Sequence, residues 1–208
     1  MANRLTLHTR HKVQRRRSRL LSELVQVLVF LALMTVVRSS LADHYYVPTG
    51  SMEYSLMPGD RVVVDKRAYG LRIPLTTIDI VGATAPIAGD IAVFDSPRDR
   101  VRLIKRIVAV GGDSVVLIDG QLRVNGQSLG DTDMEQFGER TAYLNLRDGG
   151  GPDVNQLEIP AGMVLALGDH RGNSLDGRFF GLISEKELVG RALGVYYRRQ
   201  QGFVWKPL

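Results

Sequence analysis

The chain has 208 residues, enough for one domain with a hydrophobic core or for one domain carrying a small inserted lobe, which excludes a protein of several domains. Its 44% hydrophobic and 24% charged residues are typical of a folded protein and exclude disorder over most of the chain. The net charge is +5, but seven of the 27 basic residues and no acidic residue lie in residues 1–19, so the remainder, with 20 basic and 22 acidic residues, lacks the charge of a basic nucleic-acid-binding domain.

The first predicted element is a transmembrane anchor at residues 20–42, preceded by a basic cytoplasmic tail at residues 1–19. The run from Leu20 to Val37 is mostly apolar, and as a helix rising about 1.5 Å per residue it reaches roughly 27 Å, close to the hydrocarbon thickness of a bilayer. The positive charges before this run favour a cytoplasmic N-terminus, with the later residues across the membrane. We therefore expect membrane lipid, and no nucleic acid, as a partner.

Two other interpretations of this segment stay open. A cleavable signal peptide would have the same basic start and apolar run, with Ser40-Leu41-Ala42 as its small-x-small cleavage site. Arg38 interrupts the approach to that site, which favours the anchor. A buried amphipathic helix is disfavoured because the segment is apolar nearly all round.

The chain after Pro48 is predicted to be mainly β and antiparallel, in a sandwich- or barrel-like arrangement of many short strands. Runs rich in Val and Ile alternate with Gly, Pro, Asn and Asp, and no long amphipathic helix is visible. The dipeptides Asp119-Gly120 and Asn125-Gly126 predict hairpin turns. Strands are expected at Arg61–Lys66, Asp90–Phe94, Leu103–Val110, Ser114–Ile118, Leu122–Val124, Met163–Leu167 and Leu188–Tyr197.

Two short segments carry residues suited to nucleophilic chemistry. Val47-Pro-Thr-Gly-Ser-Met52 places the Ser51 hydroxyl in a Pro/Gly turn, and Leu103-Ile-Lys-Arg-Ile-Val108 places Lys105 in an apolar strand. A serine beside a desolvated lysine can be a nucleophile with its base. Periodicity leaves Lys105 and Arg106 on opposite faces without choosing between them, but arginine cannot give up its proton. The lysine pKa, ordinarily about 10.4, would have to be lowered by burial.

The composition predicts neither a metal site nor another cofactor. There is no cysteine, which excludes a disulfide framework and a thiolate nucleophile. The four histidines lack metal-ligand spacing. A third segment, Gly168-Asp-His-Arg-Gly-Asn-Ser-Leu-Asp-Gly-Arg178, is too rich in charge and glycine for an ordinary strand and is interpreted as an ordered polar loop.

These three segments, in this order, resemble the bacterial type I signal peptidases, membrane-bound serine endopeptidases that remove signal peptides from exported proteins. The resemblance extends from about Tyr45 to Arg198. It implies a signal-peptidase-like catalytic β core at residues 43–110 and 161–208, with a small cap-like β lobe inserted at residues 111–160.

The resemblance also implies roles for individual residues. Ser51 would be the nucleophile and Lys105 its general base, with the Ser51 backbone N–H and the Thr49 hydroxyl as oxyanion donors. Supporting roles would fall to Ser174, which orients the lysine, to the ion pair of Asp176 and Arg178, and to Asp169, which holds the loop. Positions that would line the substrate site, although most could equally be core residues, are Tyr45, Val47, Pro48, Met52, Leu56, Leu103 and Ile104.

The implied protein is a monomeric, single-pass enzyme of the bacterial inner (cytoplasmic) membrane, with its catalytic domain on the periplasmic side. It would cut the signal peptides of exported preproteins after small-x-small sites. The sequence departs from the family pattern where Glu53-Tyr54 replaces a usual proline, His170 a common asparagine and Gly177 a common serine. Three alternatives stay open: a relative dedicated to one substrate, as in conjugation or pilin processing; an inactive signal-peptide-binding module; and a histidine-based hydrolase using Ser51 and His170.

Overall fold

The structure, a computed structural model, describes residues 22–31, 42–72, 79–81 and 84–208. The chain divides into two compact units, Met1–Ser39 and Ser40–Leu208. The predicted basic tail, residues 1–19, lies outside the described residues. Of the predicted anchor, residues 22–31 are helical and Ala42 is in a strand, while the others lie outside the described residues. No helix in the described part of the chain is long and apolar enough to cross a membrane.

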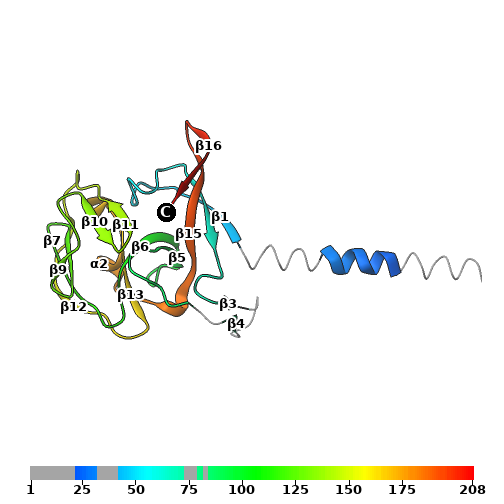
Figure 1. Ribbon diagram of the computed structural model, residues 1–208, viewed down its shortest axis with the longest axis horizontal. Coiled ribbons are helices and arrows are strands. Elements are labelled where there is room, and N and C mark those ends of the chain that lie inside the picture. Colours follow the sequence, from blue (N-terminus) through cyan, green and yellow to red (C-terminus); the bar gives the residue numbers. More distant parts are fainter. Residues whose placement is uncertain (1–21, 32–41, 73–78, 82–83) are drawn as a thin grey trace, which may run out of the picture. The chain divides into compact units, whose positions relative to one another are not determined.

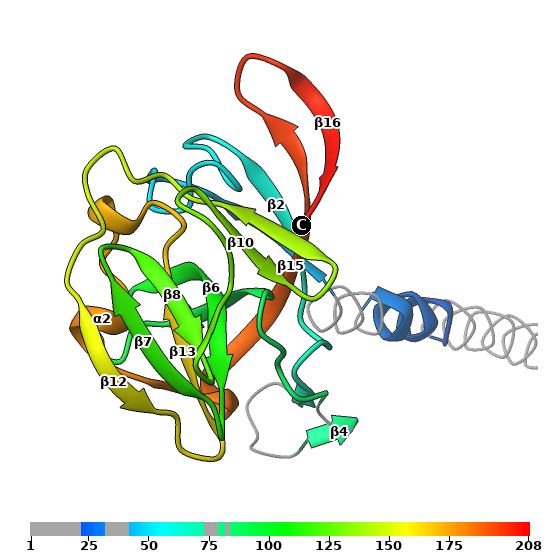
Figure 2. The ribbon, with the colours of Figure 1, turned by 60° about the vertical axis from the view of Figure 1, so that its left-hand side comes forward.

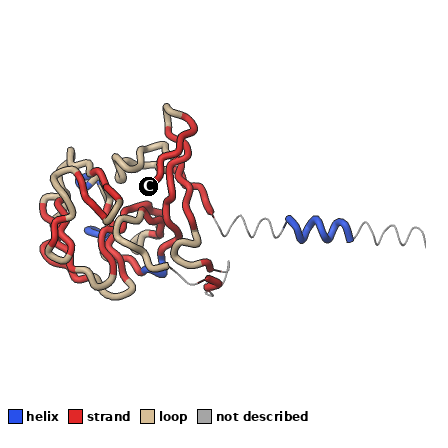
Figure 3. The backbone as a smooth tube through the Cα atoms, in the orientation of Figure 1, coloured by secondary structure: helices blue, strands red, loops and turns tan. Residues whose placement is uncertain are grey.

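The Ser40–Leu208 unit is built mainly from antiparallel strands (Figures 1 and 3). Its largest sheet has the strand order β1-β2-β15-β5-β6-β13-β14, with β16 also paired to β15. These strands are β1 (Ala42–Tyr46), β2 (Arg61–Asp65), β5 (Ile91–Asp95), β6 (Arg102–Val110), β13 (Met163–Leu167), β14 (Ile183–Ser184), β15 (Leu188–Arg198) and β16 (Gly202–Pro207).

A second group of strands falls within residues 111–160, and Figure 2 shows β7, β8 and β12 side by side there. The four-stranded sheet β12-β7-β8-β9 comprises β7 (Ser114–Ile118), β8 (Gln121–Val124), β9 (Gln127–Ser128) and β12 (Val154–Glu158). Two further two-stranded sheets pair β10 (Met134–Phe137) with β11 (Arg140–Tyr143), and β3 (Leu71–Arg72) with β4 (Asp79–Val81). The short helices are η1 (Arg171–Asn173), α2 (Gly177–Phe180) and η2 (Glu185–Glu187).

The predicted antiparallel, mainly β class is confirmed, and each of the predicted strands is present with its ends shifted by no more than one residue. Both predicted hairpin turns are also present. Asp119 and Gly120 have φ of 49° and 77°, and Asn125 and Gly126 have φ of 54° and 78°. Two successive positive φ values match the twist of the flanking strands, which is why Asx-Gly pairs favour two-residue hairpins.

Several strands escaped prediction because their composition is polar. β10 reads Met-Glu-Gln-Phe and β12 reads Val-Asn-Gln-Leu-Glu, without the Val and Ile runs used to find the others. The start of β1 differs from the predicted end of the anchor, because Ala42, predicted as the last anchor residue, pairs with Asp65 of β2. Main-chain pairing to a neighbouring strand decided these segments, and a local pattern does not reveal it.

The two groups of strands share a hydrophobic core. Val108 and Ala109 of β6 pack in one cluster with Leu165 and Leu167 of β13. The same cluster contains residues of the 111–160 region, namely Val115, Leu117, Leu122, Phe137, Ala142 and Ile159. The strand that carries Lys105 is therefore packed directly against the region predicted to be an inserted lobe.

This shared core predicts the effect of removing one of its side chains. Leu165 is 1% exposed, and Leu165→Ala is expected to lower the free energy of unfolding by about 2–5 kcal/mol, because it removes buried apolar surface and leaves a cavity. Leu193→Ala, at an exposed position of β15, is the control and should change stability by less than about 0.5 kcal/mol. Denaturant unfolding of the full chain, followed by circular dichroism, measures both, and equal losses would contradict the assignment of this core.

Candidate active site

The turn between β1 and β2 positions Ser51. The two ends of this turn are joined by backbone hydrogen bonds from Val47 N to Asp60 O, 2.9 Å, and from Gly59 N to Val47 O, 2.8 Å. Met52 and Leu56, the two apolar side chains that follow the serine in this turn, are fully buried among residues of β2, β5 and β15. The turn is thus anchored on both sides of the hydroxyl.

Lys105 lies in β6, opposite Ala92 of β5, and its side chain is only 3% exposed. Its Nζ lies 2.6 Å from Ser51 Oγ and 3.0 Å from Ser174 Oγ. Arg106, the other charged residue of this run, is equally buried but points its guanidinium elsewhere. The structure therefore brings the lysine, and not the arginine, to the serine predicted as nucleophile.

Burial lowers the pKa of the Lys105 amine to about 8, against the opposing charges of Asp176 and Asp169, while Arg178 adds to the lowering. With a pKa of about 8, roughly a tenth of the lysine is neutral at pH 7, compared with about one molecule in 2,500 for a lysine in water. The hydroxyl of Ser51 consequently has a neutral amine within hydrogen-bond distance for a useful fraction of the time.

Asp169 forms a buried ion pair with Arg106. Its two carboxylate oxygens accept from Arg106 Nε at 2.9 Å and from Nη2 at 2.8 Å. The guanidinium also donates to Gly89 O at 2.9 Å and to Ser55 Oγ at 2.8 Å. Sequence reasoning considered Arg106 only as a rival base and missed this pairing, although a second charge in an apolar strand was a signal that a buried partner was needed.

Asp176 and Arg178 form the predicted pair, with Asp176 oxygens accepting from Arg178 Nε and Nη2, both at 2.8 Å. Burial raises the pKa of the Asp176 carboxyl, but hydrogen bonding and the charge of Arg178 outweigh it, so this pKa lies below its usual value. Arg178 also donates to the backbone oxygens of Gly150 at 2.7 Å and Arg171 at 2.6 Å. The pair therefore joins the polar loop to the 111–160 region.

Gly168 allows the polar loop to approach the serine. A Cβ atom built there would collide with Ser174 Oγ and with the backbone oxygen of Ser51. The N–H of Gly168 donates to Asp176 Oδ2 at 2.9 Å, so the start of the loop is also fixed to its end. Glycine is needed at this position because no side chain fits between the loop and the serine turn.

A cavity of about 340 Å³ opens beside Ser51 and Lys105. Of the residues predicted to line a substrate site, it is lined by Val47, Pro48, Leu103 and Ile104, together with Thr49. Its remaining lining residues are Gly50, Ser51, Val101, Arg102, Lys105, Asn173 and Leu175. Sequence analysis did not anticipate Val101, Arg102, Asn173 and Leu175. Thr49 also approaches the nucleophile, its hydroxyl donating to Ser51 Oγ over 3.5 Å.

Three residues predicted for the substrate site do not line this cavity. Met52 and Leu56 are fully buried, because their side chains turn inward to anchor the serine turn. Tyr45 packs at the edge of the same core, and its hydroxyl accepts a 2.8 Å hydrogen bond from Arg102 Nη1. Tyr45 thus reaches the cavity only through Arg102.

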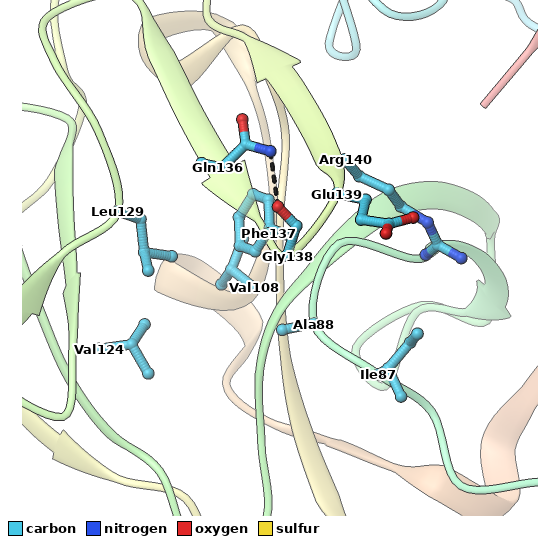
Figure 4. A pocket seen from close by; sticks show the side chains of 10 residues that line it. All are labelled: Ile87, Ala88, Val108, Val124, Leu129, Gln136, Phe137, Gly138, Glu139 and Arg140. Carbon is cyan, nitrogen blue, oxygen red and sulfur yellow. Dashed lines mark hydrogen bonds between the residues drawn. The ribbon is translucent and has the colours of Figure 1, made fainter.

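A larger cavity, of about 490 Å³, lies away from these groups, between β6 and the β10–β11 hairpin. Figure 4 shows Val108, Val124, Leu129, Phe137 and Arg140 among the residues that line it. Neither the serine nor the lysine lines it, so the smaller cavity, where the nucleophile and the amine meet, is the candidate active site.

His170 does not contact the Ser51 hydroxyl in any described interaction. Its ring nitrogens lie near the backbone oxygen of Gly50, at 3.3 Å, and the carboxylate of Asp148, at 2.9 Å. In the described part of the chain the polar partners of Ser51 Oγ are Lys105 Nζ and Thr49 Oγ1. The geometry therefore favours a lysine over a histidine as the partner of the serine.

The burial of Lys105 predicts that Lys105→Met stabilises the fold at neutral pH. The native pKa of about 8 lies below the unfolded value of about 10.5, so the native state gains stability as pH rises between these values. Below pH 8 the buried ammonium costs about 3 kcal/mol, and the variant should recover part of it at pH 7 and lose the advantage by pH 10.5. Lys186→Met, at an exposed position, is the control in denaturant unfolding across this range, and a pH-independent difference would contradict the lowered pKa.

Comparison with known proteins identifies the family of this chain. A family model described as signal peptidase, peptidase S26, matches residues 20–197. A signal peptidase I from Pseudomonas fluorescens is 30% identical over 200 residues, covering 80% of this chain and 68% of that protein. A signal peptidase I from Pseudomonas aeruginosa is 31% identical over 195 residues, covering 80% of this chain and 68% of that protein.

A crystal structure of a signal peptidase I from Enterococcus faecalis V583 matches with 28% identity and a TM-score of 0.39, covering 52% of this chain and 97% of that chain. At that score it adds nothing to the argument about fold. The family match over most of the chain and the two Pseudomonas relatives are sufficient, and they show that the chain belongs to the signal peptidase family, peptidase S26.

Proposed function

We propose that this chain is an active, membrane-anchored signal peptidase I that cuts exported preproteins after small-x-small sites, with Ser51 as nucleophile and Lys105 as general base. The observation that carries this proposal is the 2.6 Å separation of Lys105 Nζ and Ser51 Oγ at a lysine that is 3% exposed. A buried amine beside a hydroxyl is the arrangement that activates a serine without histidine.

The mechanism follows from these positions. Neutral Lys105 takes the proton from Ser51 Oγ, which attacks the scissile carbonyl carbon and forms a tetrahedral intermediate. The ammonium then protonates the leaving amine as the peptide bond breaks, which leaves an acyl-enzyme ester on Ser51. Lys105, neutral again, takes a proton from the water that hydrolyses this ester, and returns it to the serine.

Two donors are proposed for the oxyanion that develops in the attack: the backbone N–H of Ser51 and the hydroxyl of Thr49. Thr49 lines the same cavity, and its hydroxyl lies close to the nucleophile. Preorganised donors of this kind stabilise the charge of the transition state more than that of the substrate.

The substrate is proposed to bind as an extended strand along β6. β13 pairs with β6 only from Arg106 onward, whereas β5 pairs with it from Arg102, so among the described strands residues 102–105 have a free edge on one side. An extended peptide can pair with such an edge. Its alternate side chains would then point into the cavity beside Val47 and Ile104, which suits small residues at the first and third positions before the cut.

The polar loop is proposed to hold the base in place. Ser174 Oγ accepts a hydrogen bond from Lys105 Nζ and so orients the amine toward the serine. The pair of Asp176 and Arg178 fixes the part of the loop that carries Ser174, and Asp169 fixes the start of the loop through Arg106. These side chains act on the base or on its loop, and none of them takes part in a bond-making step.

The membrane anchor and the periplasmic location are part of the same proposal, as is a monomeric enzyme. Support comes from the seven basic residues of the tail and the apolar run that follows. Seven of the ten residues of the described helix, residues 22–31, are apolar, which suits a lipid environment better than water.

Cleavage of a purified preprotein with Ala-x-Ala before the cut, by the full chain in detergent, tests the dyad. Ser51→Ala and Lys105→Met should each lower kcat at least a thousandfold, because each removes a group that takes part in every step. Ser174→Ala should lower kcat about tenfold to a hundredfold, because the amine keeps its burial but loses its orientation. Ser184→Ala, far along the chain in β14, is the matched serine control.

Each alternative predicts a different outcome of this experiment. Activity that survives Lys105→Met would contradict the dyad and favour a histidine base. Tight binding of the preprotein without turnover by folded wild-type protein would identify a binding module. Cleavage restricted to one preprotein in a panel would identify a dedicated relative. In that case Glu53-Tyr54, which replaces a usual proline of the family pattern, is the first segment to exchange for that pattern.

The lowered pKa predicts the pH dependence of the reaction. Because the amine must be neutral to accept the proton, kcat/KM should rise with pH below pH 8 and level off above it. Steady-state assays from pH 6 to pH 10 measure this rise. A profile that is flat across this range, or that has its midpoint near 10.4, would show that Lys105 is not the titrating base.

A further inference from the structure

His170 occupies a buried position between the serine turn and the 111–160 region, and no step above uses it. Its side chain is 6% exposed. Its backbone N–H donates to Ser51 O at 3.1 Å, and its ring Nδ1 lies 3.3 Å from Gly50 O. Both contacts are with the main chain that presents the Ser51 hydroxyl.

The other side of the ring faces the segment from Asn145 to Asp148. Nε2 is buried, makes no hydrogen bond of good geometry, and has Asp148 Oδ2 at 2.9 Å. The backbone of Asn145 forms an isolated parallel β-bridge with the backbone of His170, and the Asn145 side-chain amide donates to Glu53 Oε2 at 3.0 Å. The ring therefore stands between the serine turn and this segment, which are also joined by the Asn145 amide and by the Arg147 guanidinium, 6.0 Å from the centre of the Tyr54 ring.

The neighbours of the ring are mainly hydrogen-bond acceptors. Gly50 O and Glu53 Oε2, the latter at 3.5 Å, lie near Nδ1, and Asp148 Oδ2 lies near Nε2. One donor, Asn145 Nδ2, is 3.4 Å from Nδ1. A neutral imidazole donates from one nitrogen only, whereas the protonated ring donates from both. Only the protonated ring can therefore donate to Gly50 O and at the same time place a positive charge beside the Asp148 carboxylate, which lies at ion-pair distance from Nε2 without forming a hydrogen bond to it.

The two charged neighbours of His170 in its own loop face away from the ring. Asp169 is engaged with Arg106, and Arg171 donates to Glu135 Oε2 at 2.6 Å. The carboxylates that face the imidazole are therefore those of Glu53, from the serine turn, and Asp148, from the 111–160 region.

We propose that His170 is a positioning residue that, when protonated, ties the serine turn to Asp148 and holds Ser51 Oγ in line with Lys105. The inference rests on the proposed function, since it concerns the same nucleophile. Deprotonation of the ring releases one of the two ties. This effect opposes that of the base, because Lys105 becomes more active as pH rises and the ring holds the turn less firmly.

The test is the ratio of the kcat of wild type to the kcat of His170→Gln, measured from pH 6 to pH 9 with the full chain in detergent and an Ala-x-Ala preprotein. We expect the variant to be about tenfold slower at pH 6, because it lacks the charge that faces Asp148, and within about twofold of wild type at pH 9, with KM little changed. Titration of Lys105 affects both proteins equally and cancels in the ratio. His44→Gln, in β1, is the matched histidine control and should give a ratio near one at every pH.

Asp148→Asn should reproduce the pH dependence of His170→Gln, and the double variant should be no slower than either single one, because both remove the same tie. A ratio that is constant with pH would overturn the proposal, since a merely structural histidine would cost the same at every pH. So would a double variant whose loss is the product of the two single losses.

A second measurement separates this inference from the proposed function. If wild type does not cleave, the proposed function fails, and the tie is tested by thermal unfolding alone. His170→Gln should then lose more stability at pH 5.5 than at pH 8.5 in the wild-type background, and show no such difference in the Asp148→Asn background. The same loss in both backgrounds would overturn the proposal.

Discussion

The amine of Lys105 is buried within hydrogen-bond distance of two hydroxyl groups, and among the described residues no carboxylate is bonded to it. The carboxylates whose charges raise its pKa, Asp176 and Asp169, are each engaged by a guanidinium, from Arg178 and Arg106. A carboxylate bonded directly to the amine would hold it as an ammonium. The two arginines thus keep the acidic groups of the loop away from the base, and the lysine stays able to accept a proton.

The place of β6 in the sheet explains how the Lys105 amine comes to be buried. It lies between β5 and β13, which pair with its two edges, and its charged residues Lys105 and Arg106 are both buried, whereas Arg102 at its start is exposed. β13 ends opposite Arg106, and the chain then leaves as the polar loop at Gly168. The end of that strand therefore does two things: it exposes the edge of β6 that is proposed to bind substrate, and it carries the loop back over the amine.

The 111–160 region supports this loop from the other side. Arg171, which is 1% exposed, donates to Gly120 O at 2.7 Å and forms an ion pair with Glu135. Arg178 donates to Gly150 O. The proposed tie through His170 would add a further connection, made directly to the serine turn. A region that shares its hydrophobic core with β6 and its polar contacts with the loop acts on the geometry of the dyad without contributing an atom to it.

The sequence by itself determined the antiparallel β class, the principal strands and the hairpin turns, and its resemblance to a known family pointed to the two residues of the proposed dyad. Local patterns carry the first three, because alternation and Asx-Gly pairs involve only neighbouring residues. The tertiary structure decided which charged residue of β6 reaches the serine, that Met52 and Leu56 anchor the turn from within the core, and that Asp169 pairs with Arg106. These outcomes depend on strand order and on contacts between residues far apart in the chain, since a period of two assigns side chains to opposite faces but does not say what covers each face.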